Sequence, residues 1–212
     1  RILSEQARIS SSEIRRGKAS EENLNRYIET SRNIYDLPLY IDETPAIAIS
    51  TMSNRARRIK RLFGLKLIVV DYIQLMRTNS NRMDGRVQEI SEITQGLKAL
   101  AKELNVPVVA LSQLSRAVEQ RDDKIPQLSD LRESGSIEQD ADVVLFVYRE
   151  QYYLEKKEPK QGSIEHAEWQ SKMSDIHGLA SLIVGKHRHG STGTVHVEFE
   201  GMFTKFKDLP KN

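Results

Sequence analysis

The sequence of 212 residues contains no cysteine. Disulfides, thiolate nucleophiles and thiolate metal sites are therefore excluded, and a cytoplasmic protein is the natural interpretation. No apolar run approaches the roughly 20 residues that a membrane-spanning helix needs, so no membrane partner is expected. The first five residues, Arg1 to Glu5, include neither an initiator methionine nor an apolar signal segment. We therefore expect a proteolytic product or a segment of a longer chain.

The sequence also has no large excess of positive or negative charge. The 32 Lys and Arg residues nearly balance the 30 Asp and Glu residues, giving a formal net charge of +2. Any contact with nucleic acid must therefore come from local basic loops and not from a global field. The five histidines show no pairing with acidic residues at metal-ligand spacing, so no protein-held metal site is predicted.

Hydrophobic periodicity predicts four helical ranges, which are 2–18, 20–35, about 47–63 and about 85–104. Ser20 is expected to start the second, and Pro38 ends that unit before a short extended piece at 39–41. The last range carries the longest apolar stripe, formed by Val87, Ile90, Ile93, Leu97, Leu100 and Leu104. A polar insert at about 150–177 has charges of both signs and is expected to be solvated and partly helical.

Three short apolar runs, at 65–70, 107–111 and 143–147, are typical of strands that are buried on both faces. Helices separate the runs, which predicts a mostly parallel sheet with crossover connections. Two later extended segments, 179–186 and 193–199, are joined by a glycine-containing link and predict an antiparallel hairpin, to which 203–207 adds an edge strand. The predicted fold class is α/β, in one domain that spans 1–212.

Polar side chains follow two of the predicted strands. Asp71 ends the first apolar run, at the carboxyl edge where ligands of α/β sheets bind. A carboxylate there can hold the water shell of Mg²⁺ beside nucleotide phosphates, although a polar residue that merely stops a strand is an equal alternative. Gln113 follows the next strand, where a neutral amide can sense a γ-phosphate or orient the attacking water. Taken alone, a polar strand end without function is the more common case.

Four segments resemble motifs of the DnaB-type replicative helicases, which have RecA-like motors. Residues 67–76 (LIVVDYIQLM) look like the Walker B segment, and 109–116 (VALSQLSR) resembles the third helicase motif. Residues 129–142 (SDLRESGSIEQDAD) resemble the fourth motif, which includes the DNA-contacting loop, and 186–190 (KHRHG) resembles the segment with the arginine finger. The segments occur in family order. The resemblance implies a RecA-like fold and an ATP-dependent DNA helicase that moves on single-stranded DNA and unwinds duplex during replication.

The resemblance also implies a role for individual residues. Asp71 is the expected Mg²⁺-organising carboxylate and Gln113 the expected γ-phosphate sensor. Arg132, Glu133 and Gly135 are expected in the loop that follows the DNA backbone, where Gly135 lets the main chain approach a phosphate closely. Without the motif, a solvated ion pair would be the preferred interpretation of Arg132 and Glu133.

Lys186 and Arg188 are two residues apart at a strand end, so both side chains are expected on one face. The resemblance implies that they reach the ATP of a neighbouring subunit and stabilise charge as it develops there. Solvated charges near a hairpin are the alternative. Family members often have Gln where this chain has His187, so no phosphate role is assigned to His187. The implied cofactors are ATP and Mg²⁺, and the implied partners are single-stranded DNA, identical subunits in a hexamer, a primase and a helicase loader.

The sequence lacks a Gly-x-x-x-x-Gly-Lys-Ser/Thr loop, which would cradle the α- and β-phosphates. In the family, this Walker A loop and the catalytic glutamate lie upstream of the position that matches Arg1. We therefore predict that the isolated chain neither binds nor hydrolyses ATP appreciably. In RecA-like sheets the strand that feeds this loop lies between the strands matching 107–111 and 143–147, so the domain is expected to be incomplete, with two unpaired strand edges.

Two other functions stay open from the sequence. A RecA-like recombinase or regulatory ATPase would share the motor core without unwinding DNA, and the motif at 129–142 argues against it. A non-catalytic interaction module would lack the Walker A loop altogether. A Gly-Lys-Thr loop encoded upstream of Arg1 would argue against that second possibility.

Overall fold

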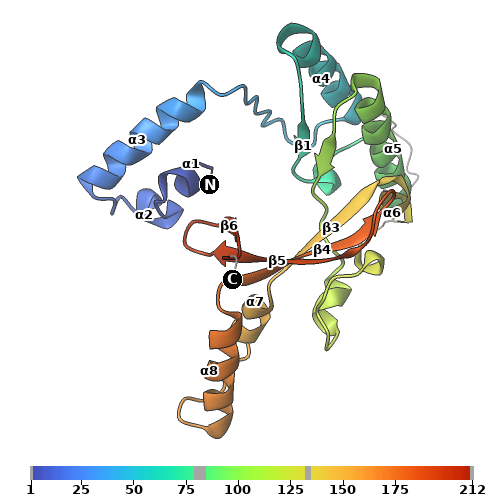
Figure 1. Cartoon of the computed structure of the whole chain (residues 1–212). Coiled ribbons are helices and arrows are strands. Elements are labelled where there is room, and N and C mark those ends of the chain that lie inside the picture. Colours follow the sequence, from blue (N-terminus) through green and yellow to red (C-terminus); the bar gives the residue numbers. More distant parts are fainter. Residues whose placement is uncertain (1, 79–84, 132–134, 211–212) are drawn as a thin grey trace. The chain divides into compact units, whose positions relative to one another are not determined.

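The computed structural model describes residues 2–78, 85–131 and 135–210 (Figure 1). The helices are α1 (Ile2–Ala7), α2 (Ser11–Arg15), α3 (Glu21–Tyr35), α4 (Ile49–Phe63), α5 (Arg86–Leu104), α6 (Gly135–Asp140), α7 (Glu150–Glu155) and α8 (Ile164–Ile176), and the 3-10 turns are η1 (Ile73–Leu75), η2 (Arg116–Gln120) and η3 (Leu128–Asp130). The strands are β1 (Ile68–Val70), β2 (Val108–Ala110), β3 (Val143–Tyr148), β4 (Leu179–His187), β5 (Gly193–Glu200) and β6 (Lys205–Asp208). The α/β fold class is therefore confirmed.

The chain divides into two compact units. The first comprises 1–42, 147–183 and 194–212, and the second comprises 43–146 and 184–193. Every predicted site residue that the structure describes belongs to the second unit. Among the described residues, none of the helices has the length and apolar character that crossing a membrane requires.

In the second unit, β1 and β2 form the predicted parallel pair, in which Ile68 lies opposite Val108 and Val70 opposite Ala110. Helix α5 is the crossover between them, and the stripe on it is buried at Ile90, Ile93, Leu97, Leu100 and Leu104, whereas Val87 is 57% exposed. Helix α4 packs on α5 around Ala56. The two helices approach so closely that a Cβ on Gly96 would lie 2.6 Å from Ile49 Cγ1.

Strands β2 and β3 belong to different sheets. The described strands form a two-stranded sheet in the order β1-β2 and a four-stranded sheet in the order β3-β4-β5-β6. Each of β2 and β3 thus lies at the end of its sheet among the described residues, which agrees with the two unpaired edges that were expected. Apolar side chains are open to solvent on both strands, since Val109 is 49% and Leu145 60% exposed.

Strands β4 and β5 form the predicted hairpin. Only residues 188–192 connect these two neighbouring strands, which is too short for a parallel crossover. At the far end of the hairpin, Phe199 N donates to Gly178 O over 2.6 Å. The predicted edge strand is found as β6, which pairs antiparallel with β5 so that Glu200 lies opposite Lys205.

The single helix predicted over 2–18 is wrong. It is divided into α1 and α2 because the chain turns at Arg8, which has a φ of 54°, and buries Ile9 to 1% exposure. Ser10 then begins a new helix, since its Oγ accepts a hydrogen bond from Ser12 N over 3.3 Å. This is an ordinary N-cap, which helical periodicity alone does not reveal.

Two other predictions about helices are confirmed. Ser20 starts α3, and its Oγ accepts from Asn23 N over 3.2 Å. The polar insert is partly helical, with α7 and α8 held together by a hydrogen bond of 2.8 Å from Trp169 Nε1 to Leu154 O. A second hydrogen bond links α7 to the segment that follows α8, because the backbone N of Gly178 donates to Gln151 Oε1.

Candidate functional site

Asp71 and Gln113 lie at the same edge of the parallel pair. Two main-chain hydrogen bonds continue the pairing past the strand ends, from Leu111 N to Val70 O (2.9 Å) and from Ile73 N to Leu111 O (3.0 Å). Ile73 is 1% exposed and anchors this segment in the core. The residues that follow the two strands are thereby held side by side, with Asp71 and Gln113 both exposed to solvent.

Gln74 holds the main chain of Gln113. Its side-chain oxygen accepts from Gln113 N over 3.2 Å, and its side-chain nitrogen donates to Ser112 Oγ over 2.9 Å. An amide is suited to this position because it carries both a donor and an acceptor. The sequence argument missed Gln74, although it stands as a polar residue between apolar neighbours in the segment that resembles Walker B. Gln74 thus fixes the main chain of Gln113 and does not bind its side chain.

Asp71 fits a Mg²⁺ ion that is held through water. Among the described residues, its carboxylate accepts no hydrogen bond and forms no ion pair, and no group of three His, Cys, Asp or Glu side chains is placed to hold a metal. Mg²⁺ keeps several waters and takes one or two carboxylates together with phosphate oxygens, so it needs no cage made of protein alone. A lone, exposed carboxylate beside an exposed amide meets that requirement.

The segment after Gln113 pairs with the segment that leads into the predicted DNA loop. Leu114 and Leu131 form an antiparallel bridge, and Ser115 N donates to Asp130 O over 2.7 Å. Asp130 is only 4% exposed and accepts two hydrogen bonds from Arg121, at 2.8 Å and 3.1 Å. Such a bidentate, charge-assisted pair fixes both partners in orientation. The start of the loop is therefore held firmly next to the Gln113 segment.

Of the three predicted DNA-binding residues, Arg132 and Glu133 lie outside the described residues. Gly135 is described and begins α6. Apart from its chain neighbours and the backbone of α6 itself, no described atom lies within 4 Å of the point where a Cβ would stand. That open space is compatible with the close approach of a phosphate, and the DNA role of all three residues stays a prediction.

Lys186 and Arg188 have different partners, although both lie at the end of β4. Lys186 Nζ donates to the main-chain oxygens of Glu138 and Gln139, at the C-terminal turn of α6. Cations are favoured there because the last carbonyls of a helix lack partners within it. Arg188 binds the residue just before β3, since its N donates to Asp142 O over 2.8 Å and its Nη1 to Asp142 Oδ1 over 3.3 Å.

A second cation reaches the carboxylate of Asp142. Lys98 Nζ lies 2.5 Å from Asp142 Oδ1 and also donates to Asp140 O over 3.1 Å. The hydrogen bond from Lys98 is the main reason that the pKa of Asp142 is lowered from its ordinary value of 3.8, and Arg188 adds to the effect. Asp142 is therefore ionised at neutral pH. The sequence argument assigned no role to Asp142 or Lys98.

Asp71 and Gln113 lie at one strand edge, whereas the side chains of Lys186 and Arg188 bind different partners. Among the described residues, no hydrogen bond or ion pair joins the first two residues to the second two. Asp71 and Gln113 follow the carboxyl ends of β1 and β2, whereas Arg188 lies beside the residue that precedes β3.

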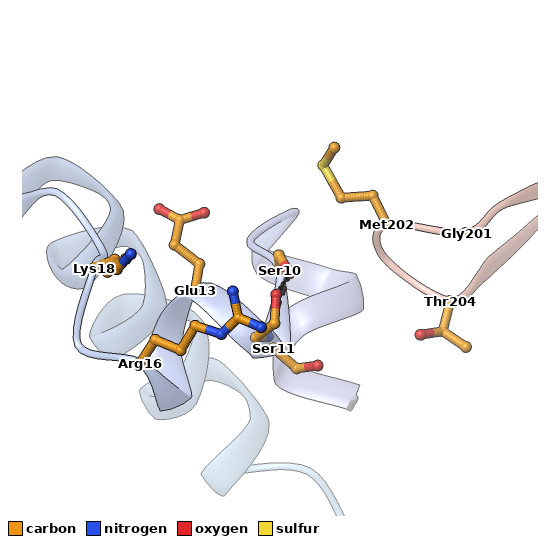
Figure 2. A pocket seen from close by; sticks show the side chains of 9 residues that line it. Ser10, Ser11, Glu13, Arg16, Lys18, Gly201, Met202 and Thr204 are labelled. Atoms are coloured by element: carbon orange, nitrogen blue, oxygen red, sulfur yellow. Dashed lines mark hydrogen bonds between the residues drawn. The ribbon is translucent and has the colours of Figure 1, made fainter.

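A pocket of about 690 Å³ lies in the first unit, between the segment around α2 and the turn at 201–204 (Figure 2). Ser10 and Ser12 are joined there by a hydrogen bond of 2.7 Å between their hydroxyls. The lining also includes Arg16 and Lys18, but none of the described site residues contributes to it.

Comparison with known proteins gives concordant results. The family model for the DnaB-like helicase C-terminal domain matches residues 1–208. "Replicative DNA helicase DnaB" of Rickettsia typhi is 53% identical over 211 residues, and the protein of the same name from Geobacillus stearothermophilus is 41% identical over 211 residues. The matches cover the whole chain but only 42% and 43% of those two relatives. The chain thus spans less than half the length of these curated relatives.

Two solved structures agree with these matches. One, which is described as an ATPase domain, has a TM-score of 0.82 and 35% identity, over 98% of this chain and 68% of that one. A DnaB-like replicative helicase whose structure is described together with its interactions with primase has a TM-score of 0.81 and 34% identity, over 98% of this chain and 47% of that one. With a family model that covers nearly every residue, the chain belongs to the DnaB-like helicase C-terminal domain family.

Proposed function

We propose that the protein to which this chain belongs is a replicative DNA helicase that couples ATP hydrolysis to translocation on single-stranded DNA and to unwinding of the duplex. The observation that carries the proposal is the placement of Asp71 and Gln113 at one carboxyl edge of a parallel strand pair, in a member of the DnaB-like family. An acid and a neutral amide at this edge suit a nucleotide whose γ-phosphate changes during the cycle.

Each of the site residues has a separate role at the nucleotide. Asp71 holds the water shell of Mg²⁺, and bound Mg²⁺ supplies neutralisation of phosphate charge. Gln113 contacts the γ-phosphate, and the bonds from Gln74 keep its main chain in place. Lys186 and Arg188 act on the nucleotide of the adjoining subunit, where a cation offsets the charge that develops in transfer.

The DNA is held by Arg132, Glu133 and Gly135. The bridge between Leu114 and Leu131 supports a direct mechanical link from the γ-phosphate to this loop. A shift of the Gln113 segment on hydrolysis would move the main chain at Leu131, which is the residue just before the loop. ATP hydrolysis would thereby change the grip on DNA.

The proposal includes partners. A finger that acts on another subunit's nucleotide requires a neighbouring subunit, and a homo-hexameric ring is the assembly that the family resemblance implies. A primase is proposed because one similar structure is described with its primase interactions. A helicase loader is proposed from the family resemblance, and a cytoplasmic location from the lack of cysteine in the sequence.

The test uses the full-length protein. Single-stranded DNA is expected to stimulate its ATPase activity, and ATP is expected to drive displacement of a labelled strand. Asp71→Asn is expected to abolish both activities, since an amide holds the Mg²⁺ shell poorly, whereas the exposed control Asp175→Asn is expected to keep them. A wild-type protein that hydrolyses ATP without displacing a strand would favour a recombinase or a regulatory ATPase instead.

A further inference from the structure

We propose that Asp142 is the positioning residue of the arginine finger: it orders the Arg188 side chain before a phosphate arrives, and Lys98 keeps the carboxylate paired when Arg188 turns to that phosphate. This inference rests on the proposed function. It adds two residues, from α5 and from the segment before β3, to the machinery of the intersubunit site.

Asp142 binds Arg188 by both main chain and side chain. The main-chain bond of 2.8 Å fixes where Arg188 leaves β4, and the bond of 3.3 Å from Nη1 to Oδ1 restricts where its guanidinium points. An arginine side chain that is free in solution loses rotamer entropy when it is ordered. A finger that is partly ordered in advance loses less of that entropy on reaching the transition state.

The Asp142 carboxylate serves two cations. Lys98 and Arg188 both bind Oδ1, and Lys98 is the closer, at 2.5 Å against 3.3 Å. Arg188 is also the more open of the two, with 58% of its side chain exposed against 23% for Lys98. When Arg188 leaves for a phosphate, Asp142 therefore stays paired with Lys98 and is not left as a lone charge. The ion pair with Asp142 thus orders the Arg188 side chain without preventing it from moving to a phosphate.

The segment before β3 also connects Arg188 to α6, the helix that follows the predicted DNA loop. Lys186 binds the carbonyls of Glu138 and Gln139, and Thr94 Oγ1 donates to Asp140 Oδ2 over 2.6 Å. Helix α6 is thus clamped to α5 on one side and to β4 on the other. A movement of α6 on DNA binding would be passed to Asp142 two residues after its end, and from there to Arg188.

The test compares full-length rings that carry Asp142→Asn, which removes the charge and keeps the shape, and Asp142→Glu, which keeps the charge. Asp142→Asn is expected to lower the DNA-stimulated kcat roughly two- to fivefold, the rate equivalent of an exposed ion pair. The KM for ATP is expected to change less than about twofold, because the interaction matters only in the transition state. Asp142→Glu is expected to restore most of the loss.

The decisive experiment measures the effect of Asp142→Asn on the ATPase rate again, in a ring that also carries Arg188→Ala. Residual rates roughly 10³-fold below wild type must be resolved, so radiolabelled ATP is used. A residue that acts through Arg188 has no further effect once Arg188 is gone. The matched control is Glu103→Gln, which breaks another exposed carboxylate–arginine pair of the same unit, with Arg57, and is expected to leave kcat unchanged.

Equal losses in the two backgrounds would overturn the inference, because Asp142 would then act independently of the finger. An Asp142→Asn ring that is as fast as wild type, or faster, would overturn it as well. If the proposed function is wrong, the wild-type ring itself will show no DNA-stimulated ATP hydrolysis. That outcome is recognised before any variant is compared. Size-exclusion chromatography verifies that each variant forms the same ring.

Discussion

Asp130 offers the sharpest test of how the base of the DNA loop is held. Its carboxylate accepts two bonds from Arg121 and a third from Gln127 N over 2.8 Å, and the side chain is 5% exposed. Asp130→Ala removes all three bonds and leaves Arg121 without its counter-charge. Breaking a buried ion pair costs about 3–5 kcal/mol, but Arg121 is 32% exposed and recovers water, so we expect about 2–3 kcal/mol.

This loss is local, and amide hydrogen exchange of the full-length protein measures it. The amide of Ser115, which donates to Asp130 O, and that of Leu131 next to Asp130 are expected to exchange roughly 30-fold faster or more in Asp130→Ala, as about 2 kcal/mol of local stability implies. Asp122→Ala, an exposed change in the segment between η2 and η3, is the control and is expected to leave exchange unaltered. Exchange within about twofold of wild type at both amides would refute the argument that the Asp130 carboxylate holds this segment.

Three further predictions concern the nucleotide edge and the finger. Gln74→Ala is expected to lower kcat by loosening Gln113, with little change in melting temperature; an unchanged steady-state ATPase rate would argue against that role. Gly185→Ala is expected to lower stability by about 1–3 kcal/mol, measured as a lower melting temperature, because the added Cβ would lie 2.6 Å from Phe146 Cε2; an unchanged melting temperature would show that the contact yields. Because its pKa is lowered in the folded state, Asp142 contributes stability above its ordinary pKa of 3.8 and loses it as the pH falls through the lower folded value. At neutral pH, wild type is thus expected to be more stable than Asp142→Asn by at most about 1 kcal/mol, which is measured as a higher melting temperature. The difference in melting temperature is expected to disappear in acid, and a difference that persists there would contradict the ion pair.

The parallel pair could be predicted because its signals are local. A continuous apolar run, a helical stripe and a second run specify strand, crossover and strand, and the polar residues after the runs then fall at one edge. The division of the first predicted helix was missed because Ile9 continues an apolar pattern while it is in fact buried at a corner, where Ser10 caps the next helix. Periodicity cannot distinguish these two cases.

Gln74, Lys98 and Asp142 could not be recognised from the sequence. Each acts through a partner that is distant in the chain: Gln74 reaches a residue 39 positions away, and Asp142 one 46 positions away. No spacing rule relates such positions, since only the tertiary fold brings them together. The motif resemblance indicated which segments to consider but could not assign the hydrogen bonds within them.

We propose that Asp71 and Arg188 serve one nucleotide from two different subunits. The most direct test coexpresses full-length Asp71→Asn and Arg188→Ala chains, each inactive as a uniform ring, and measures DNA-stimulated ATPase activity of the mixed rings. In a random equal mixture, about a quarter of the interfaces combine an intact Asp71 with an intact Arg188, so activity is expected to return to roughly that fraction of wild type. Mixed rings that hydrolyse ATP no faster than the two uniform variants would show that the two residues do not share a site.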